Sequence, residues 1–519
     1  MADRGRLTGG SAEREMATGS TVAGSRPEFR GLQYWMERVL KELDSVREAP
    51  EPDAVHDLRV AIRRCRSVAA VMEEVDPDAA WPDMRKLGRK LFRQLGDLRD
   101  TQVLEDWAKQ LGPESDPIRE RLLGRFAPQE KELQQAALRA VEKFDQKSWK
   151  KLERKLQKRS RLVPPDGLAA ECLALERLEA AKELHVRALR AEKPETWHAL
   201  RIGVKRFRYT VESLLPQRYE EWGENLKRIQ DLLGELHDLD VLSGKIEEVA
   251  SGMDEVRAAW AERIASQRHE RIDTYRGLSM GENGLWQQWR HGLPDHRRLI
   301  AASQARLRAT ARALEVNTRR ATLVSRLALR LFDRMAKLQA EPVLASREYR
   351  KLMMAAARLH AIGAGLDANS PQKAARKYLK SMKLPPTWTE TEWEIMAKVV
   401  RYHRGALPDV NYKSFARYSQ EEQKMICTLA GVLRLARALS KCGVQTPIGL
   451  RVERSVDALI VHVPSLAESE ENAARLAAGK YLLESSIGLP VIVKAAAMLP
   501  KVVELPKKEE FPPASAASD

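Results

Sequence analysis

The sequence has few cysteines and no long apolar run. Four cysteines occur in 519 residues, and none forms a CxxC pair or joins histidines at zinc-binding spacing. This excludes a zinc finger and argues against a disulfide framework, so we expect a reducing, cytoplasmic location. No stretch of about 18 uninterrupted apolar residues is present, and we therefore expect no membrane-spanning helix and no membrane partner.

The two ends of the chain lack the patterns of folded segments. The first 30 residues have no apolar core of the kind that a secretory signal carries. The last 14 residues are rich in proline, alanine and charge. We predict disordered tails at residues 1–27 and 506–519.

Acidic residues are outnumbered by basic ones. The chain contains 89 Lys and Arg against 73 Asp and Glu, which gives a formal charge of +16 and a pI near 9.6. Such a charge attracts phosphate-rich polyanions or anionic lipids, although it implies nothing about the fold. Because 43% of the residues are hydrophobic, a chain of this length can bury more than one core.

Strand-like alternation is almost absent between residues 31 and 345, where nearly every window has apolar residues at helical spacing. Proline or glycine together with charged residues interrupts this pattern at residues 47–54, 110–117, 161–167, 191–195 and 277–284. Long helices joined by short polar turns are typical of antiparallel bundles. We therefore predict a mainly α-helical protein.

One basic motif occurs twice. Residues 55–72 read VHDLRVAIRRCRSVAAVM, and WHALRIGVKRFRYTVESLLP at 197–216 repeats the motif 142 residues later, from His56 to His198. A second pair follows in the same order, LGDLRDTQVL at 95–104 and LGELHDLDVL at 233–242, at an offset of 138 residues. Two motifs that recur in order at nearly equal separation predict two homologous helical units.

Each copy of the basic motif predicts a helix with one cationic and one apolar face. At about 100° per residue the cationic positions fall within an arc of roughly 80°. They are His56, Arg59, Arg63 and Arg66 in the first copy and His198, Arg201, Lys205 and Arg208 in the second. The adjoining arc carries Leu58, Ile62, Cys65 and Ala69, or Leu200, Val204, Phe207 and Val211. Like charges one turn apart cost helix stability a few tenths of a kcal/mol per pair, so the cationic face either binds an anion or lies open to water.

Two details favour the anion. A solvated face has no reason to keep a histidine at the same place in both copies, or to prefer Arg, whose planar fork suits phosphate, over Lys. The histidines could instead be core residues or metal ligands, but no ligand partner stands at coordinating spacing on these helices. We interpret them as hydrogen-bond donors to phosphate. Further candidate contacts are Arg85, Arg89 and Arg93, expected on one helix, Lys227, and His237, whose counterpart is Arg99. The basic segment 149–161 is predicted to be a solvated helix face.

Two copies of H-x-x-R-x-x-x-[RK]-R-x-R, each followed by an LG-acidic-L-basic-D helix, resemble the CHAD family, the conserved-histidine α-helical domain. The resemblance covers residues 28–300. It implies two antiparallel four-helix bundles (28–165 and 166–300) related by a pseudo-twofold axis, with basic helices lining a groove or pore that binds inorganic polyphosphate. The implied contacts are His56, Arg59, Arg63, Arg64 and Arg66, and His198, Arg201, Lys205, Arg206 and Arg208.

The pattern changes beyond residue 346. Helical segments continue to about residue 441, after which 449–465 alternates like a β-hairpin, followed by a polar helix and the apolar segment 489–497. Residues 301–500 resemble the HD-superfamily domain at the C-terminus of exopolyphosphatases and guanosine pentaphosphatases (Ppx/GppA). We expect a helical domain at 301–445 and a small α+β subdomain at 446–505.

The metal ligands that an HD phosphohydrolase needs do not match this sequence. The early histidine is replaced by Arg320, and the His-Asp pair reads His360-Ala361. The segment in which family members carry further histidines reads PQKAARKY at 371–378, without a histidine, and the late aspartate is replaced by Arg437. Only His360 and His403 remain as ligands, and two arginines would repel a divalent cation. We therefore predict no metal, no cofactor and no hydrolysis here, and a domain that serves as a second basic docking surface or a regulatory module.

The favoured interpretation is a non-enzymatic, cytoplasmic polyphosphate-binding protein, with a role in polyphosphate granules or in regulation. Two alternatives remain at this point: a metal-dependent phosphohydrolase of polyphosphate or alarmone nucleotides, and a nucleic-acid-binding protein. The basic motifs contain few aromatic residues on which bases could stack, apart from Phe207 and Tyr209, which argues against single-stranded nucleic acid.

Overall fold

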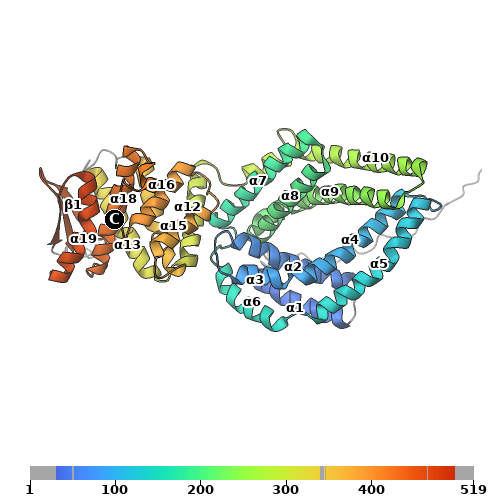
Figure 1. Cartoon of the computed structure of the whole chain (residues 1–519), viewed down its shortest axis with the longest axis horizontal. Helices are drawn as coiled ribbons and strands as arrows, with labels where there is room; N and C mark the ends of the chain where they lie inside the picture. The colour runs from blue at the N-terminus through green and yellow to red at the C-terminus, as the bar shows by residue number, and fades with distance from the viewer. Residues whose placement is uncertain (1–30, 49–51, 339–343, 345, 465, 497–519) are drawn as a thin grey trace, which may run out of the picture.

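The structure is a computed structural model that describes residues 31–48, 52–338, 344, 346–464 and 466–496. Both predicted tails lie outside the described residues. The described part has a helical body at one end and a smaller domain with a sheet at the other (Figure 1). The mainly α-helical fold is as predicted. None of the helices in the described part is long and apolar enough to span a bilayer.

The first half of the helical body contains four long helices and two short ones: α1 (Leu32–Glu48), α2 (Pro52–Met72), α3 (Ala80–Leu87), α4 (Arg89–Leu111), α5 (Pro117–Glu142) and α6 (Gln146–Ser160). Helices α1, α4 and α6 end at or beside predicted breaks, whereas α2, α3 and α5 end at positions where no break was predicted. Local chemistry explains where α5 starts. Asp116 accepts hydrogen bonds from the backbone nitrogens of Ile118 and Arg119, so it caps α5, and Pro117 occupies the first turn, where no intrahelical donor is needed.

The second half also contains four long helices and then a short one: α7 (Leu168–Ala191), α8 (Pro194–Leu214), α9 (Pro216–Val249), α10 (Asp254–Ser279) and α11 (Leu285–His291). Prolines again start α8 and α9. The predicted apolar arcs are confirmed, because all eight of their residues are buried: Leu58, Ile62, Cys65, Ala69, Leu200, Val204, Phe207 and Val211.

The two halves meet at both of their ends. At one end α2 packs against α8 and a shared core forms around them. At the other end α4 and α5 pack against α9 and α10 around a second apolar cluster that includes Trp107, Phe126, Leu239 and Trp260. Between these contacts the helix pairs diverge (Figure 1). The apolar cores therefore hold the two halves around a polar middle region.

One predicted helix is interrupted. We expected Arg85, Arg89 and Arg93 on a single helix, but α3 ends at Leu87 and α4 begins at Arg89, with Gly88 as a turn between them. Glycine has no side chain to hold a helix and is among the poorest helix formers, so the break falls there. A Cβ at this position would lie 3.4 Å from a methyl carbon of Ile62, which brings α2 close to the break.

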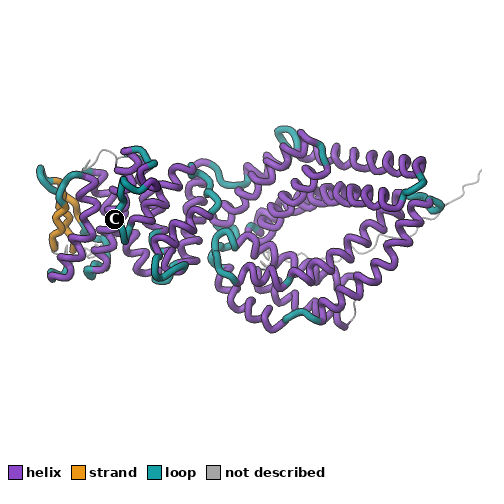
Figure 2. The backbone as a smooth tube through the Cα atoms, viewed as in Figure 1, coloured by secondary structure: helices purple, strands orange, loops and turns teal. Residues whose placement is uncertain are grey.

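The C-terminal domain is helical with a small sheet. Its helices are α13 (Thr318–Lys337), α14 (Arg347–Leu359), the 3-10 helix η2 (Ile362–Gly365), α15 (Pro371–Ser381), α16 (Glu390–Tyr402), α17 (Lys413–Ala416), α18 (Gln420–Lys441) and α19 (Glu470–Ile487). The predicted hairpin is present as β1 (Arg451–Arg454) and β2 (Leu459–Pro464), which pair antiparallel. After α19, β3 (Val491–Ala496) pairs parallel with β2, and the sheet closes the far end of the domain (Figure 2).

Helix α12 (His296–Leu314) joins the two parts of the molecule. Its Ala309 belongs to the core around α7, and its Leu307 and Leu314 belong to the core of the C-terminal domain. Arg306 forms an ion pair with Glu176 of α7, and both side chains are almost fully buried, at 1% and 5% exposed. A buried pair of this kind holds only if both partners remain, since a single buried charge is costly.

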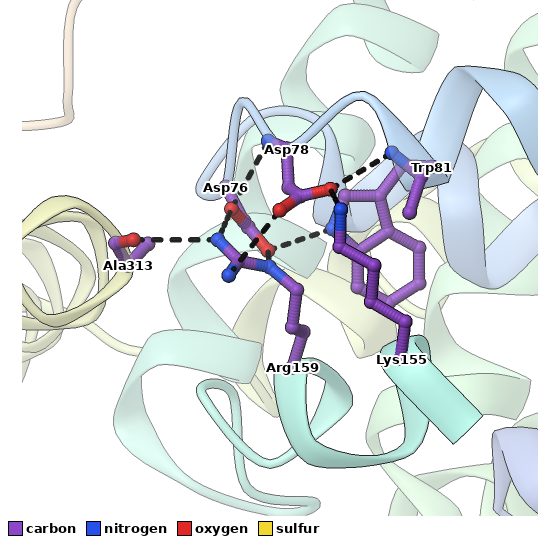
Figure 3. A network of polar contacts seen from close by, with 7 residues as sticks. Asp76, Asp78, Trp81, Lys155, Arg159 and Ala313 are labelled. Atoms are coloured by element: carbon purple, nitrogen blue, oxygen red, sulfur yellow. Dashed lines mark hydrogen bonds and ion pairs between the residues drawn. The ribbon is translucent and has the colours of Figure 1, made fainter. Parts of the chain in front are cut away.

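A polar network reinforces this junction (Figure 3). Arg159 donates to Asp76, which also accepts from the indole nitrogen of Trp81 at 2.8 Å and from the backbone nitrogen of Asp78 at 3.2 Å. Arg159 also donates to the carbonyl oxygen of Ala313 at 3.3 Å. Lys155 pairs with Asp78 at 2.8 Å. The prediction of a solvated face for 149–161 is therefore wrong for Arg159, because acidic residues that precede α3 in the sequence lie against α6. Lys155 remains exposed although it is paired.

Candidate anion-binding site

The two basic helices place their cations in one region. Lys205 of α8 lies close enough to Arg59 and Arg63 of α2, and to Arg201, that these charges lower its pKa to about 8, although burial is the larger cause. Arg63 reaches across to α8 and lies over the ring of Tyr209, 5.5 Å from its centroid. We call Arg59, Arg63, Arg201 and Lys205 the central cluster. It combines residues of both motif copies, so the copies face each other.

Each copy of the motif carries its own counter-ion. In the first half, Arg59 pairs with Asp100 of α4 at 3.7 Å. In the second half, Arg201 lies close to Asp238 of α9. Asp100 and Asp238 occupy the same position of the two LG motifs, and the two carboxyls are close to each other. Burial, together with Asp100, raises the pKa of Asp238 to about 6, although Arg201 and Lys205 oppose the shift.

The histidines also follow the repeat. His56 is exposed and lines a pocket of about 170 Å³ together with Arg59 and Arg99. In the second copy, His198 contacts His237, the counterpart of Arg99, with 3.2 Å between their Nδ1 atoms and 4.5 Å between ring centroids. One Nδ1 must donate to the other, so the acceptor ring carries its proton on Nε2 and can offer it to an anion.

His237 is neutral at physiological pH. Burial, together with the nearby charges of Arg201, His198 and Lys205, lowers its pKa to about 4. The expectation that histidine donates to phosphate is compatible with this state, because a neutral imidazole still has one N–H. The positive charge of the region comes from the central cluster instead.

Arg64 and Arg208 lie beside the central cluster, and neither joins it. Arg64 forms an ion pair with the buried Glu212 of α8 and lies over Trp35, 5.0 Å from the ring centroid. The hydroxyl of Tyr219 is 3.5 Å from Arg208, which is also close to Glu212. Arg64 thus links the two halves through Glu212, and its charge is already balanced.

The remaining predicted cations are dispersed. Arg66 donates to the carbonyl oxygen of Arg85 at 2.9 Å, and Arg85 in turn pairs with Glu73 at 2.7 Å. The other predicted contacts have exposed side chains outside the central cluster: Arg89, Arg93, Arg206 and Lys227. No acidic residue was predicted from the sequence at this site. Asp100 and Asp238 could have been found, because the two LG motifs share this aspartate.

The C-terminal domain contains a second group of predicted residues. His360 and His403 are buried with ring centroids 5.5 Å apart, and their Nδ1 atoms bond the carbonyl oxygens of Ala357 and Val400 at 2.8 and 2.6 Å. This hydrogen bond is the one that orients metal-binding histidines. Arg437, however, is close enough to lower the pKa of both histidines, although burial is the main cause.

A divalent cation does not fit this histidine pair. Arg404 is also close to His403, and Arg320 is close to Arg437. The charged groups that act on the two histidines are therefore arginines, where a metal site would need carboxylates. Within the described residues, no group of three or more His, Cys, Asp or Glu side chains is arranged to hold a metal ion. Two neutral nitrogens among cations are a poor donor set for a hard metal, which requires anionic oxygen.

The fold consists of a helical body built from two similar halves and a second helical domain with a small sheet, and each of the two parts carries a group of basic side chains. Comparisons with known families agree. Residues 30–247 match the CHAD domain, and residues 304–464 match the Ppx/GppA phosphatase, domain III. The chain thus joins a CHAD domain to a Ppx/GppA domain III, and these two domains fit a polyphosphate-related role.

Among solved structures, the crystal structure of the CHAD domain from the plant Ricinus communis is similar at 23% identity. The match covers 51% of this chain and 90% of the Ricinus communis chain, with a TM-score of 0.35. No match was found among curated proteins.

Proposed function

We propose that this protein binds inorganic polyphosphate along the central cluster without hydrolysing it. The observation that carries the proposal is the packing of α2 against α8, in which Arg63 lies over Tyr209 and Lys205 lies close to Arg59 and Arg63. Four like charges held this closely are unfavourable unless anions offset them, and Asp100 and Asp238 offset only part of the charge.

A flexible polyanion fits this arrangement better than a single small anion. The cations follow two helices that are supplied by different repeats, so successive phosphoryl groups of one chain can contact them in turn. Arg offers paired N–H groups to each phosphoryl group, and binding releases counterions from the chain. The absence of hydrolysis is part of the proposal, and it rests on the misfit between the HD-like domain and a divalent metal.

The test is a competition at fixed salt. Full-length protein is titrated with labelled long-chain polyphosphate, and then challenged with unlabelled polyphosphate, double-stranded DNA or single-stranded DNA of equal charge concentration. We expect Arg63→Gln/Lys205→Gln to weaken polyphosphate binding at least about tenfold, because each hydrogen bond to a charged group contributes about 1.5 to 3 kcal/mol. Lys151→Gln/Arg154→Gln, which removes two exposed cations of α6, is the matched control.

Three results would contradict the proposal. DNA that displaces polyphosphate at lower charge concentration would make nucleic acid the better ligand. Equal losses of affinity in Arg63→Gln/Lys205→Gln and in the α6 control would show that binding depends on net charge alone and not on the central cluster. Release of orthophosphate from bound polyphosphate on addition of Mg²⁺ or Mn²⁺ would show a hydrolase.

A further inference from the structure

A cavity of about 970 Å³ lies between the first turns of α13 and the last turn of α18. Its lining includes Arg319, Arg320, Arg326 and Lys441, together with the polar side chains of Asn317 and Ser440. The start of one helix and the end of another contribute backbone dipoles of opposite sign, so these largely cancel. The charge of the cavity comes from its side chains.

Arg437 connects this cavity to the histidine pair. It lies one helical turn before Lys441 on α18, close to Arg320, and it is near both His360 and His403. Burial, together with the neighbouring arginines, lowers the pKa of Arg437 to about 10. For Lys441 the largest cause of a lowered pKa is Arg437 itself.

We define the arginine pocket as Arg320 and Lys441, which line the cavity, together with Arg404 and Arg437, whose charges lie close to them outside its lining. Among the described residues, none of these four side chains has a carboxylate within ion-pair distance, and no acidic group is among the main influences on Arg437 or Lys441. Arg434, on the neighbouring turn, instead donates to the carbonyl oxygens of Tyr402, Gly405 and Ala406. The arginine pocket therefore lacks the internal counter-ions that the central cluster has.

We propose that the arginine pocket binds a compact phosphoanhydride, namely inorganic pyrophosphate or the end of a short polyphosphate chain. A small anion with several charges can contact several cations that lie close together, as in the arginine pocket. The cations of the central cluster instead follow two helices, which suits a longer chain. Guanidinium groups with unused donors match phosphoryl oxygens in a paired geometry. The proposal goes beyond polyphosphate binding by the CHAD domain, since it gives the C-terminal domain a ligand and a site of its own.

The lining of the cavity distinguishes inorganic from nucleotide diphosphates. Leu323 is its one large apolar side chain, and no aromatic ring is among the residues that line it in the described part of the chain. A nucleobase would find no stacking surface, which is the usual source of sequence-tolerant base affinity. We therefore expect a nucleoside diphosphate to bind no more tightly than pyrophosphate.

The experiment uses full-length protein and isothermal titration with pyrophosphate at low salt. Two forms should bind one pyrophosphate per chain at the C-terminal domain: wild type, and Arg63→Gln/Lys205→Gln, in which the central cluster is weakened. Arg437→Gln and Arg320→Gln should each reduce the affinity at least about tenfold. Arg320 is exposed, so its substitution tests the site even where Arg437→Gln affects folding. Lys413→Gln, which removes an exposed cation of α17, is the matched control.

The outcomes separate this proposal from the function proposed above. Loss of pyrophosphate binding in Arg63→Gln/Lys205→Gln alone would place the ligand in the CHAD domain and overturn the arginine pocket. So would equal affinity of wild type, Arg437→Gln and Arg320→Gln, or sulfate binding as tightly as pyrophosphate. Tighter binding of guanosine or adenosine diphosphate would refute the ligand class. Failure of long-chain polyphosphate to bind the central cluster would leave these results unchanged.

Discussion

Polyphosphate binding should depend on pH in a way that Lys205 sets. Its pKa is about 8 in the folded protein, so roughly nine-tenths of its ammonium groups carry a proton at pH 7 and roughly a tenth at pH 9. A polyanion stabilises the charged form and therefore raises this pKa on binding. Linkage then requires that binding takes up protons above pH 8, and that the affinity falls as pH rises through 8, by up to about tenfold per pH unit.

Asp238 should cause a second change in polyphosphate affinity, at lower pH. Its pKa of about 6 means that the carboxyl is ionised at pH 7 and becomes neutral as pH falls through 6. Neutralisation removes a negative charge beside the ligand, so the affinity should rise again between pH 6.5 and 5.5, by up to about tenfold per pH unit. Internal phosphoryl groups of a long chain stay ionised throughout, and the ligand itself therefore contributes little to the profile.

Two substitutions separate the effect of Lys205 at high pH from the effect of Asp238 at low pH. Lys205→Arg keeps the charge at all accessible pH values, so the fall above pH 8 should disappear. Asp238→Asn should bind more tightly at pH 7 and lose the rise below pH 6. The assay is titration calorimetry from pH 5.5 to 9.5 in buffers of different ionisation enthalpy, which gives both affinity and proton uptake. An unchanged profile in Lys205→Arg, or a flat wild-type profile, would refute the reasoning.

Three further predictions concern salt, the domain junction and metals. Arg63→Gln should lower the slope of log affinity against log salt by about one, and an unchanged slope would show that Arg63 does not contact phosphate. Glu176→Gln leaves Arg306 buried without its partner and should lower the free energy of unfolding, measured in urea, by about 3 to 5 kcal/mol. Glu179→Gln, at an exposed position, is the control. An equal effect of both substitutions would contradict a buried ion pair. Mg²⁺ or Mn²⁺ should release no phosphate from polyphosphate, while release that His360→Ala abolishes would establish a hydrolase.

The spacing of apolar residues predicted which side chains are buried, because the buried face of a helix is set by residues close together in the sequence. The arc of Leu58, Ile62 and Cys65 recurs in the second repeat as Leu200, Val204 and Phe207, and every one of these side chains is buried. Because these apolar residues occupy one arc of each helix, the cations were expected on the adjoining arc. The two halves were likewise visible as an offset in the sequence.

Contacts between distant segments were beyond the reach of such patterns. Arg64 looks like its neighbour Arg63 in the motif, but it pairs with Glu212, 148 positions away along the chain. Arg159 looks solvated, but it pairs with Asp76 across the fold. In each case the sequence shows a cation, and only the arrangement of helices decides whether a carboxylate lies opposite. Predictions of free charge from one helix therefore need the packing of its neighbours.

The two basic regions balance their charge in different ways, and this difference bears on function. In the central cluster each repeat supplies an aspartate, so cations and carboxylates coexist within the protein and an incoming chain must compete with Asp100 and Asp238. Such a surface favours a long polymer, which gains many contacts at once and can exchange along the site. The arginine pocket supplies no carboxylate of its own among the described residues, so a single compact anion completes it. One chain would then hold two phosphate ligands of different length, and weakening either site should leave the other's affinity unchanged.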